Sequence, residues 1–173
     1  MLSEPSAFSL DLAKPVLFLD FDGVLHRADE PSIGGNGEYI WRESHFCWKG
    51  HLEDLLKAYP NVGIVLSTDW RQYHDIEFLQ ELLGPALGER LLGVMPIVQN
   101  GNRAEAIKIE ASRLRIAHWI GLDDHSSVFD ARDNGDHRFV SCHPARGLEC
   151  SEIRAELDVK LRRLEQLSSD QEK

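Results

Sequence analysis

The chain has 173 residues, with 19 basic and 29 acidic side chains that give a formal net charge of −10. This length suits a single domain that buries a core without disulfides to stabilise it. The negative charge argues against broad electrostatic binding to nucleic acid or to anionic membranes, although it leaves room for a local basic surface.

The cysteines and the ends of the chain indicate a cytoplasmic protein. The three cysteines, an odd number without a framework spacing, fit free thiols in a reducing compartment. The first residues carry an early acid and no basic start before an apolar core, so they do not predict a secretory signal, and no apolar run approaches membrane-spanning length. We expect an N-terminal extension over 1–14, one domain over 15–167 and a polar tail over 168–173, with no obligate protein partner.

The first predicted strand lies in residues 16–25, with the sequence VLFLDFDGVL. Its apolar start has no polar face, as expected of a strand that is buried on both sides of a parallel sheet. Asp20 and Asp22 follow, and because burying ionised carboxylates is costly, they indicate a metal ion, a phosphate-handling site or exposure at the edge of the sheet. Gly23 allows the backbone to turn sharply and to approach a ligand.

Other sites that use a D-x-D pattern fit this stretch less well. An EF-hand calcium loop needs an oxygen ligand at its fifth position and glycine at its sixth, where this chain has Val24 and Leu25. A glycosyltransferase would be expected to have a longer nucleotide-binding segment before its two aspartates. A polar strand end without any chemistry remains an alternative, because short motifs also arise by chance.

A polar segment with several glycines and aromatic residues follows, over residues 26–49. It is too long for a tight turn, so we expect a flap or an irregular hairpin over the end of the first strand. Its aromatic residues, which include Trp41, Phe46 and Trp48, could stack on a base or a sugar, or could pack the flap onto the body of the domain. The general tendency of aromatic side chains to be buried favours the packing role.

The next two predicted elements repeat the pattern of the first strand. Helical spacing of leucines predicts a helix over 50–59, and a second apolar strand follows over 62–66. This strand ends in Ser67 and Thr68, and Arg71 lies just beyond them. A second buried strand therefore delivers polar groups at its end.

The middle of the chain predicts a helix, a strand and another helix. Leucine and isoleucine spacing indicates a helix over 76–83 that a Gly-Pro pair closes. We expect a short strand over 91–98, a turn over 100–102 and a helix over 103–113.

The last third of the chain again alternates between strands and helices. A strand over 116–122 ends in Asp123 and Asp124, so a third apolar run ends in groups suited to chemistry. A further strand is expected over 138–142, and Ser151 can cap the C-terminal helix that follows.

This alternation predicts an α/β fold with a doubly wound parallel sheet and right-handed crossovers. Ligands bind such sheets beyond the carboxyl ends of the strands, where the strand order reverses. Polar groups from the ends of three strands should therefore meet at one edge of the sheet: Asp20, Asp22, Ser67, Thr68, Asp123 and Asp124.

In their order along the chain, the motifs FLDFDGVL, IVLST and IGLDD resemble those of the haloacid dehalogenase (HAD) superfamily of phosphohydrolases. The combination LDFDGVLH, VLSTDWR and GLDD is similar to that of one domain within it. The resemblance covers about residues 15–165 and looks strongest to the HAD domain of Swiss Army Knife RNA repair proteins. It implies a Rossmann-like HAD fold that is capless or carries only a small flap insert.

The mechanism that this resemblance implies agrees with the chemistry of the residues. Asp20 would be the nucleophile and form an aspartyl-phosphate, and Asp22 would protonate the leaving oxygen and then activate water. Because two carboxylates cannot approach a phosphate dianion unaided, a divalent ion is required, and the oxygen ligands indicate Mg²⁺. The implied ligands are the Asp20 carboxylate, the Asp22 backbone carbonyl, and either Asp123 or Asp124.

The resemblance also implies roles for the polar groups of the second motif. Ser67 would donate a hydrogen bond to a phosphoryl oxygen, with Thr68 and backbone amides as helpers, and the alternative for Ser67 is a helix cap. Arg71 could bind the substrate phosphate or an RNA backbone, or could form a surface salt bridge with Asp69 or Asp75.

The family needs a cation near the phosphoryl group, usually a lysine from the helix before the third motif. Arg103 opens that helix, whereas Lys108 lies about 7 Å further along its axis. We therefore expect Arg103 to be this cation, although arginine is not a free replacement for lysine.

These observations predict a Mg²⁺-dependent phosphatase that acts on a terminal phosphate of RNA or DNA or on a small phosphomonoester. A missing cap favours a large substrate, whereas the negative net charge argues against nucleic acid. The alternative is a binding or regulatory module with weak or no turnover, which Arg103 in place of lysine and Asp69 beside Ser67 would support. The presence of both Asp20 and Asp22 argues against that alternative.

Overall fold

The computed structural model describes residues 14–30, 32–36, 38–97 and 101–171 of the chain. The N-terminal extension predicted over 1–14 therefore lies outside the described residues, except for its last residue. Of the polar tail predicted over 168–173, residues 168–171 continue the last helix, and the remainder lies outside the described residues.

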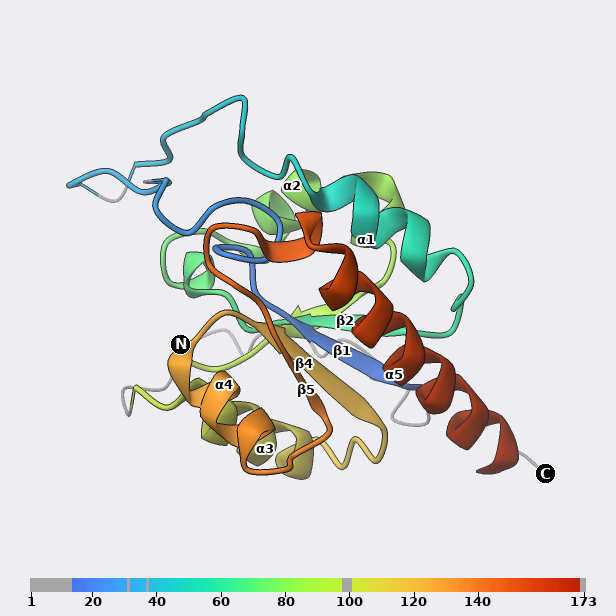
Figure 1. Cartoon of the computed structure of the whole chain (residues 1–173). Helices are drawn as coiled ribbons and strands as arrows, with labels where there is room; N and C mark the ends of the chain where they lie inside the picture. The colour runs from blue at the N-terminus through green and yellow to red at the C-terminus, as the bar shows by residue number, and fades with distance from the viewer. Residues whose placement is uncertain (1–13, 31, 37, 98–100, 172–173) are drawn as a thin grey trace, which may run out of the picture.

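A five-stranded, all-parallel sheet forms the centre of the domain, as the alternating pattern predicted (Figure 1). Its strands lie in the order β3-β2-β1-β4-β5, so the direction of winding reverses beside β1. The strands are β1 (Val16–Leu19), β2 (Gly63–Leu66), β3 (Leu91–Val94), β4 (Trp119–Asp123) and β5 (Phe139–Ser141).

Helices cover both faces of this sheet (Figure 1). One face is covered by α1 (Lys49–Leu56), α2 (Ile76–Gly88) and α5 (Ser151–Gln171), and the other by α3 (Arg103–Arg113) and α4 (Ser126–Asp133). Two short 3-10 helices, η1 (Asp69–Gln72) and η2 (Gly147–Glu149), complete the described elements. This arrangement is the predicted doubly wound α/β fold.

The first strand contributes to both hydrophobic cores. Leu17 and Leu19 pack on the face of α1, α2 and α5, whereas Val16 and Phe18 pack on the face of α3 and α4. All four residues are almost completely buried, which explains why this strand has no polar side in its sequence.

The register of the strands sets how far along the strand direction the functional residues lie. Leu19 of β1 pairs with Leu66 of β2 on one side and with Leu122 of β4 on the other. The residue after each of these three leucines therefore lies at the same carboxyl edge of the sheet. Those residues are Asp20, Ser67 and Asp123.

The structure differs from the predicted helices in a few details. Helix α4 was not predicted, because it buries only Val128 and so has no apolar periodicity. The Gly-Pro pair does interrupt the helix as predicted: Gly84, with φ of +73° and ψ of 176°, is not helical, and a short second helical segment follows it up to Gly88 within α2. Ser151 is the first residue of α5 and donates to Glu152, so it does not precede the helix as a cap.

The predicted flap is a short irregular hairpin between β1 and α1. Ile33 and Tyr39 form an isolated antiparallel bridge, and the Ile40 amide donates to the Ser32 carbonyl at 2.9 Å. Figure 1 shows this segment projecting from the body at the upper left. Its described aromatic residues differ in burial, because Phe46 and Trp48 are buried and Trp41 is exposed. The two buried rings pack the flap onto the domain.

Candidate functional site

Three carboxyl groups meet at the carboxyl edge of the sheet. Asp20, directly after β1, and Asp123 and Asp124, at the end of β4, each place a carboxylate oxygen within 4.8 Å of the others. Asp20 and Asp123 are buried, and Asp124 is partly buried. This cluster is the one group of acidic, histidine or cysteine side chains among the described residues with the spacing of a metal site.

The environment of this acidic cluster opposes the ionisation of its members. Burial raises the pKa of Asp20 well above that of an ordinary carboxyl group, and Asp123 raises it further. Burial also raises the pKa of Asp123, although Arg103 lowers it, and burial together with Asp123 raises the pKa of Asp124 to about 7. A divalent cation would favour the charged forms of all three groups, so this oxygen-only set of donors fits a hard metal ion.

Gly23 leaves room for one of these carboxylates. Its φ is +71°, a conformation that residues with a Cβ rarely adopt, and a Cβ built there would lie 2.1 Å from Oδ2 of Asp124. The backbone of the first motif therefore contacts the side chain of the third motif directly, which no other residue type would allow.

Arg103 lies at the edge of this acidic cluster, at the start of α3. Its Nη1 atom lies 4.0 Å from Oδ1 of Asp20 and 3.7 Å from Oδ2 of Asp123. Its Nη2 atom lies 3.0 Å from Oδ1 of Asp69, and the guanidinium also donates to the Ser67 carbonyl. The side chain is only 11% exposed, so it places a positive charge deep in the site.

Lys108, the alternative cation, lies in other surroundings. Its Nζ atom pairs with Glu105 at 3.9 Å and with Asp136 at 3.7 Å. About 1.4 turns of helix separate it from Arg103. Of the two candidates, the fold brings only Arg103 to the acidic cluster.

The two hydroxyl residues of the second motif have different surroundings. Ser67 is fully buried, and its hydroxyl lies 3.5 Å from Oδ2 of Asp123. Thr68, and not Ser67, is the helix cap, because its Oγ1 accepts a hydrogen bond from the Trp70 amide at the start of η1. Ser67 is thus the hydroxyl that faces the acidic cluster.

Arg71 is occupied by the backbone around the site. It donates to the carbonyls of Ser67, Thr68, Met95 and Pro96, and it pairs with Asp69 at 3.3 Å. The side chain of Arg71 is only 5% exposed. The structure therefore uses its donors to tie the loop after β2 to the loop after β3, and this arrangement does not favour the expected contact with substrate.

The carboxylate of Asp22 lies apart from the acidic cluster, although only one residue separates it from Asp20. Its Oδ2 atom accepts a hydrogen bond from Nε1 of Trp70 at 2.8 Å, and its Oδ1 atom lies 3.1 Å from Nε2 of His26. Sequence reasoning did not assign a role to these two partners. The available signal was their position in the motifs LDFDGVLH and VLSTDWR.

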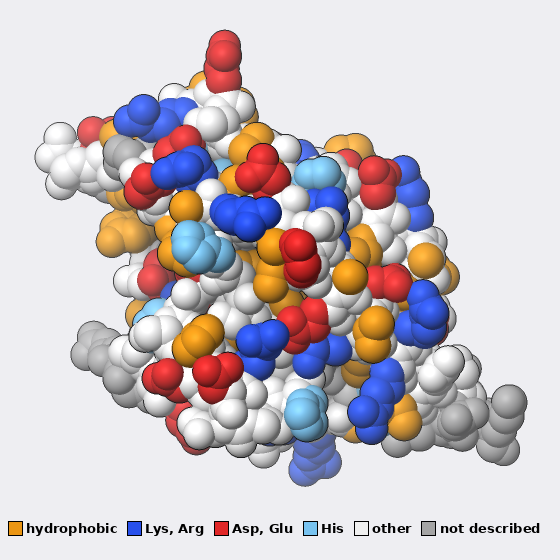
Figure 2. Space-filling model, in the orientation of Figure 1, with side chains coloured by type: hydrophobic (Ala, Val, Ile, Leu, Met, Phe, Trp, Pro, Cys, Tyr) orange, Lys and Arg blue, Asp and Glu red, His pale blue; other side chains and the backbone are white. Residues whose placement is uncertain are grey.

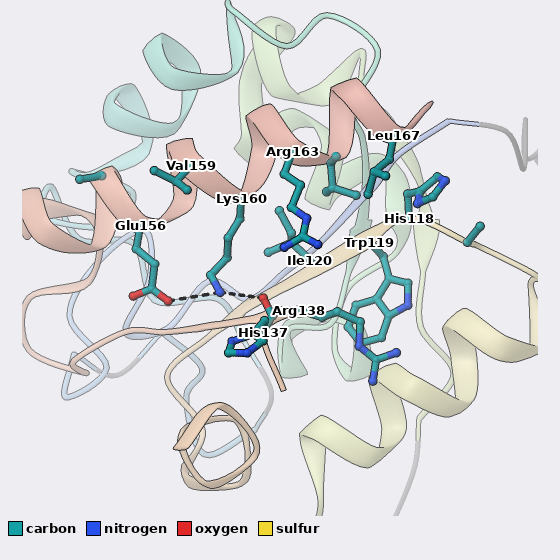
Figure 3. Close-up of a pocket in the computed structure, with 13 residues that line it drawn as sticks. His118, Trp119, Ile120, His137, Arg138, Glu156, Val159, Lys160, Arg163 and Leu167 are labelled. Atoms are coloured by element: carbon teal, nitrogen blue, oxygen red, sulfur yellow. Dashed lines mark hydrogen bonds and ion pairs between the residues drawn. The ribbon is translucent and has the colours of Figure 1, made fainter. Parts of the chain in front are cut away.

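A cavity lies elsewhere, and Figure 3 shows it between α5, the first residues of β4, and the residues just before β5. It has a volume of about 740 Å³ and lies at the amino ends of the strands, opposite the acidic cluster. Lys160 crosses it and bonds both Glu156 and the His137 carbonyl (Figure 3). Since none of the predicted site residues lines this cavity, it is not the candidate site.

Basic and acidic side chains are interspersed over the face of the molecule drawn in Figure 2. The basic residues on that face do not gather into one broad patch.

Comparison with known proteins adds one finding. The model of the family described as the HAD domain in Swiss Army Knife RNA repair proteins matches residues 16–153, which include all three motifs. No curated protein and no solved structure matches the chain at a significant level. Among the described residues, no helix has the length and apolar character needed to span a membrane.

Proposed function

Because the chain belongs to the family of HAD domains found in Swiss Army Knife RNA repair proteins, we propose that it is a Mg²⁺-dependent phosphohydrolase that acts through Asp20. The observation that carries this proposal is the buried cluster of Asp20, Asp123 and Asp124 with the guanidinium of Arg103 at its edge. Three adjacent carboxyl groups, two of them buried and one partly buried, are unfavourable for stability, so a ligand that needs them is the simplest reason for their presence.

The reaction proceeds in two displacements at phosphorus. The Asp20 carboxylate attacks the phosphorus atom, the bond to the leaving oxygen breaks, and that oxygen takes a proton from Asp22. Water then attacks the aspartyl-phosphate and gives a proton to Asp22, and cleavage of the bond between phosphorus and the Asp20 oxygen releases phosphate. Both aspartates return to their starting states.

The positions of the carboxylates support one set of metal ligands. Asp20, Asp123 and Asp124 would hold Mg²⁺, with the backbone carbonyl of Asp22 as a further oxygen ligand. When bound, the ion would neutralise charge on the phosphoryl oxygens and so allow the Asp20 carboxylate to approach.

Arg103 and Ser67 are the groups that would bind the phosphoryl oxygens. Arg103 is at the cluster and carries five N–H donors, of which the substrate phosphate could take those that face the carboxylates. The hydroxyl of Ser67 is within reach of the same position. We expect Thr68 to act through the backbone of η1, since its own hydroxyl caps that helix.

The substrate we favour is a terminal phosphate on a nucleic-acid strand, because the family description names RNA repair. The net charge of −10 favours a small phosphomonoester as the second candidate. A binding or regulatory module with weak turnover is the alternative from another class.

The experiment measures phosphate release from a terminally phosphorylated RNA oligonucleotide and from an aryl phosphate, with Mg²⁺ and with a chelator. The wild type is compared with Asp20→Asn and with Asp54→Asn, a matched change at an exposed aspartate of α1. We expect metal-dependent release in the wild type and in Asp54→Asn, and none in Asp20→Asn. No release above that of Asp20→Asn on either substrate, with or without metal, would instead support the binding module.

A further inference from the structure

The carboxylate of Asp22 is held by two N–H donors, one from four residues further along the chain and one from the segment after β2. Trp70 donates from Nε1 to Oδ2 at 2.8 Å, and Nε2 of His26 lies 3.1 Å from Oδ1. The side chain of Asp22 is 32% exposed, whereas those of His26 and Trp70 are almost fully buried. The buried side of this carboxylate is therefore occupied, and its remaining lone pairs face the open side.

The tautomer of His26 follows from its second contact. Its Nδ1 atom accepts a hydrogen bond from the backbone amide of Phe46 at 3.4 Å. In the neutral ring the proton then lies on Nε2, which donates to Asp22. Each oxygen of the Asp22 carboxylate thus has one donor.

Packing prevents either donor from turning away. The indole of Trp70 has ring contacts with Phe21 at 5.7 Å, Phe46 at 5.5 Å and Tyr39 at 5.3 Å. The ring of His26 packs against Phe46 at 5.2 Å and Trp70 at 5.8 Å. Phe46 and Tyr39 belong to the flap, so the docked flap supports both donors.

Local backbone structure brings both donors to Asp22. After Asp22 the chain turns sharply, with the amides of Val24 and Leu25 both bonded to the Phe21 carbonyl, and this turn brings His26 back to Asp22. Trp70 is placed by η1, whose first turn is capped by Thr68.

We propose that Trp70 and His26 are positioning residues that hold the Asp22 carboxylate away from the acidic cluster and toward the leaving oxygen. The inference rests on the proposed function, in which Asp22 gives its proton to that oxygen. Without these donors, the short side chain of Asp22 would be free to turn away from the leaving oxygen. Asp22 would then be lost as a proton donor, while Asp20 would still be able to attack phosphorus.

The test measures how the loss in kcat/KM caused by Trp70→Phe depends on the leaving group of the substrate. An alkyl phosphate needs protonation of its leaving oxygen, whereas dinitrophenyl phosphate releases a stable anion. The constant kcat/KM covers only the steps up to release of the first product, so water activation does not enter it. We expect Trp70→Phe to lower kcat/KM on the order of 100-fold for the alkyl phosphate and by less than about 3-fold for dinitrophenyl phosphate.

The matched control is Trp119→Phe, which removes another buried indole, at the start of β4 and on the α3 and α4 face. It should leave the ratio of the two kcat/KM values unchanged. Equal losses on both substrates in a folded Trp70→Phe protein would overturn the positioning role.

His26 allows a test by conservative replacement. Glutamine can place an amide N–H close to the position of Nε2, whereas leucine has no donor. We expect His26→Leu to show the same selective loss on the alkyl phosphate, and His26→Gln to recover most of it. A glutamine variant no better than the leucine variant, with both folded, would contradict the role of the donor.

A further measurement does not depend on turnover. The chain has four tryptophans, so its indole N–H groups give a small set of resolved NMR signals, and loss in Trp70→Phe assigns the one from Trp70. We expect Asp22→Ala to move the Trp70 signal upfield as its acceptor is removed, and to leave the Trp119 signal in place. An unmoved Trp70 signal would overturn the inference, and this result would be separate from any failure of the phosphatase assay.

Discussion

The Nη1 atom of Arg103 lies 4.0 Å from the Oδ1 atom of Asp20. The two residues come from different parts of the chain and meet because the end of β1 and the start of α3 lie at the same edge of the sheet. Burial alone would lower the pKa of Arg103, but the carboxylates of Asp123 and Asp20 outweigh it and raise the pKa. The guanidinium therefore stays charged and offsets part of the negative charge of the acidic cluster.

This contact predicts that Arg103, and not Lys108, supports turnover. Arg103→Ala should lower kcat/KM for phosphate release by about 100-fold, because it removes a fixed donor from the position of the phosphoryl oxygens. Lys108→Ala is the matched control and should stay within about 2-fold of the wild type, since Lys108 pairs with Glu105 and Asp136. Comparable losses in the two variants would show that the phosphate-binding cation has been misassigned.

Gly23→Ala should disrupt the metal site as well as the fold. The new methyl group would have to displace the Asp124 carboxylate, and the positive φ would be strained, so we expect a loss of about 2 kcal/mol in the free energy of unfolding. Gly93→Ala is the control, because a Cβ there would meet no atom within 4 Å. Urea denaturation and calorimetric titration with Mg²⁺ would measure the two effects, and unchanged metal affinity in Gly23→Ala would count against Asp124 as a ligand.

The acidic cluster predicts how stability depends on pH in the absence of metal. The pKa of Asp124 is about 7 in the folded protein, against an ordinary value of 3.8. Between these values the folded state binds more protons than the unfolded state, so this group's contribution to stability is present at low pH and is lost as the pH rises through about 7. In a chelator, this group should therefore make the melting temperature higher at mildly acidic pH than at a pH above 7.

Added Mg²⁺ should reverse this trend, since it binds the ionised carboxylates. The increase in melting temperature on adding Mg²⁺ should be larger at alkaline pH than at mildly acidic pH. Asp124→Asn serves as the control and should show a flatter dependence in the chelator. An increase that does not vary with pH would argue against a carboxylate metal site.

Arg71 should contribute to stability more than to substrate binding. Arg71→Lys keeps the charge but cannot reach all the carbonyls that arginine bonds, so we expect a loss of about 1–3 kcal/mol in the free energy of unfolding, with little change in KM. Arg163→Lys, at an exposed arginine of α5, is the control and should change stability by less than about 0.5 kcal/mol. A large increase in KM with unchanged stability would restore the substrate-binding interpretation of Arg71.

Much of the fold followed from local sequence patterns. Runs that are apolar without alternation, such as Val16 to Leu19, indicated strands buried on both faces, and their alternation with helical segments indicated a parallel sheet. Helix α4 was missed because it buries so little apolar surface that its sequence resembles a loop. The Gly-Pro pair does break the helix at Gly84, as its sequence indicated, and only the short helical segment after it, which buries Leu87, was not predicted.

Some features of the candidate site could likewise be predicted from the sequence, and others could not. By itself, the sequence determined that Asp20, Ser67 and Asp123 would lie together, because residues that follow paired parallel strands must share one edge of the sheet. The position of Arg103 at the start of its helix also indicated that it would reach the acidic cluster, as it does. Only the tertiary structure decided that Arg71 bonds backbone carbonyls and that Trp70 and His26 hold Asp22. Strand periodicity is a property of neighbouring residues, whereas the partner of a polar side chain depends on which distant segments pack against it.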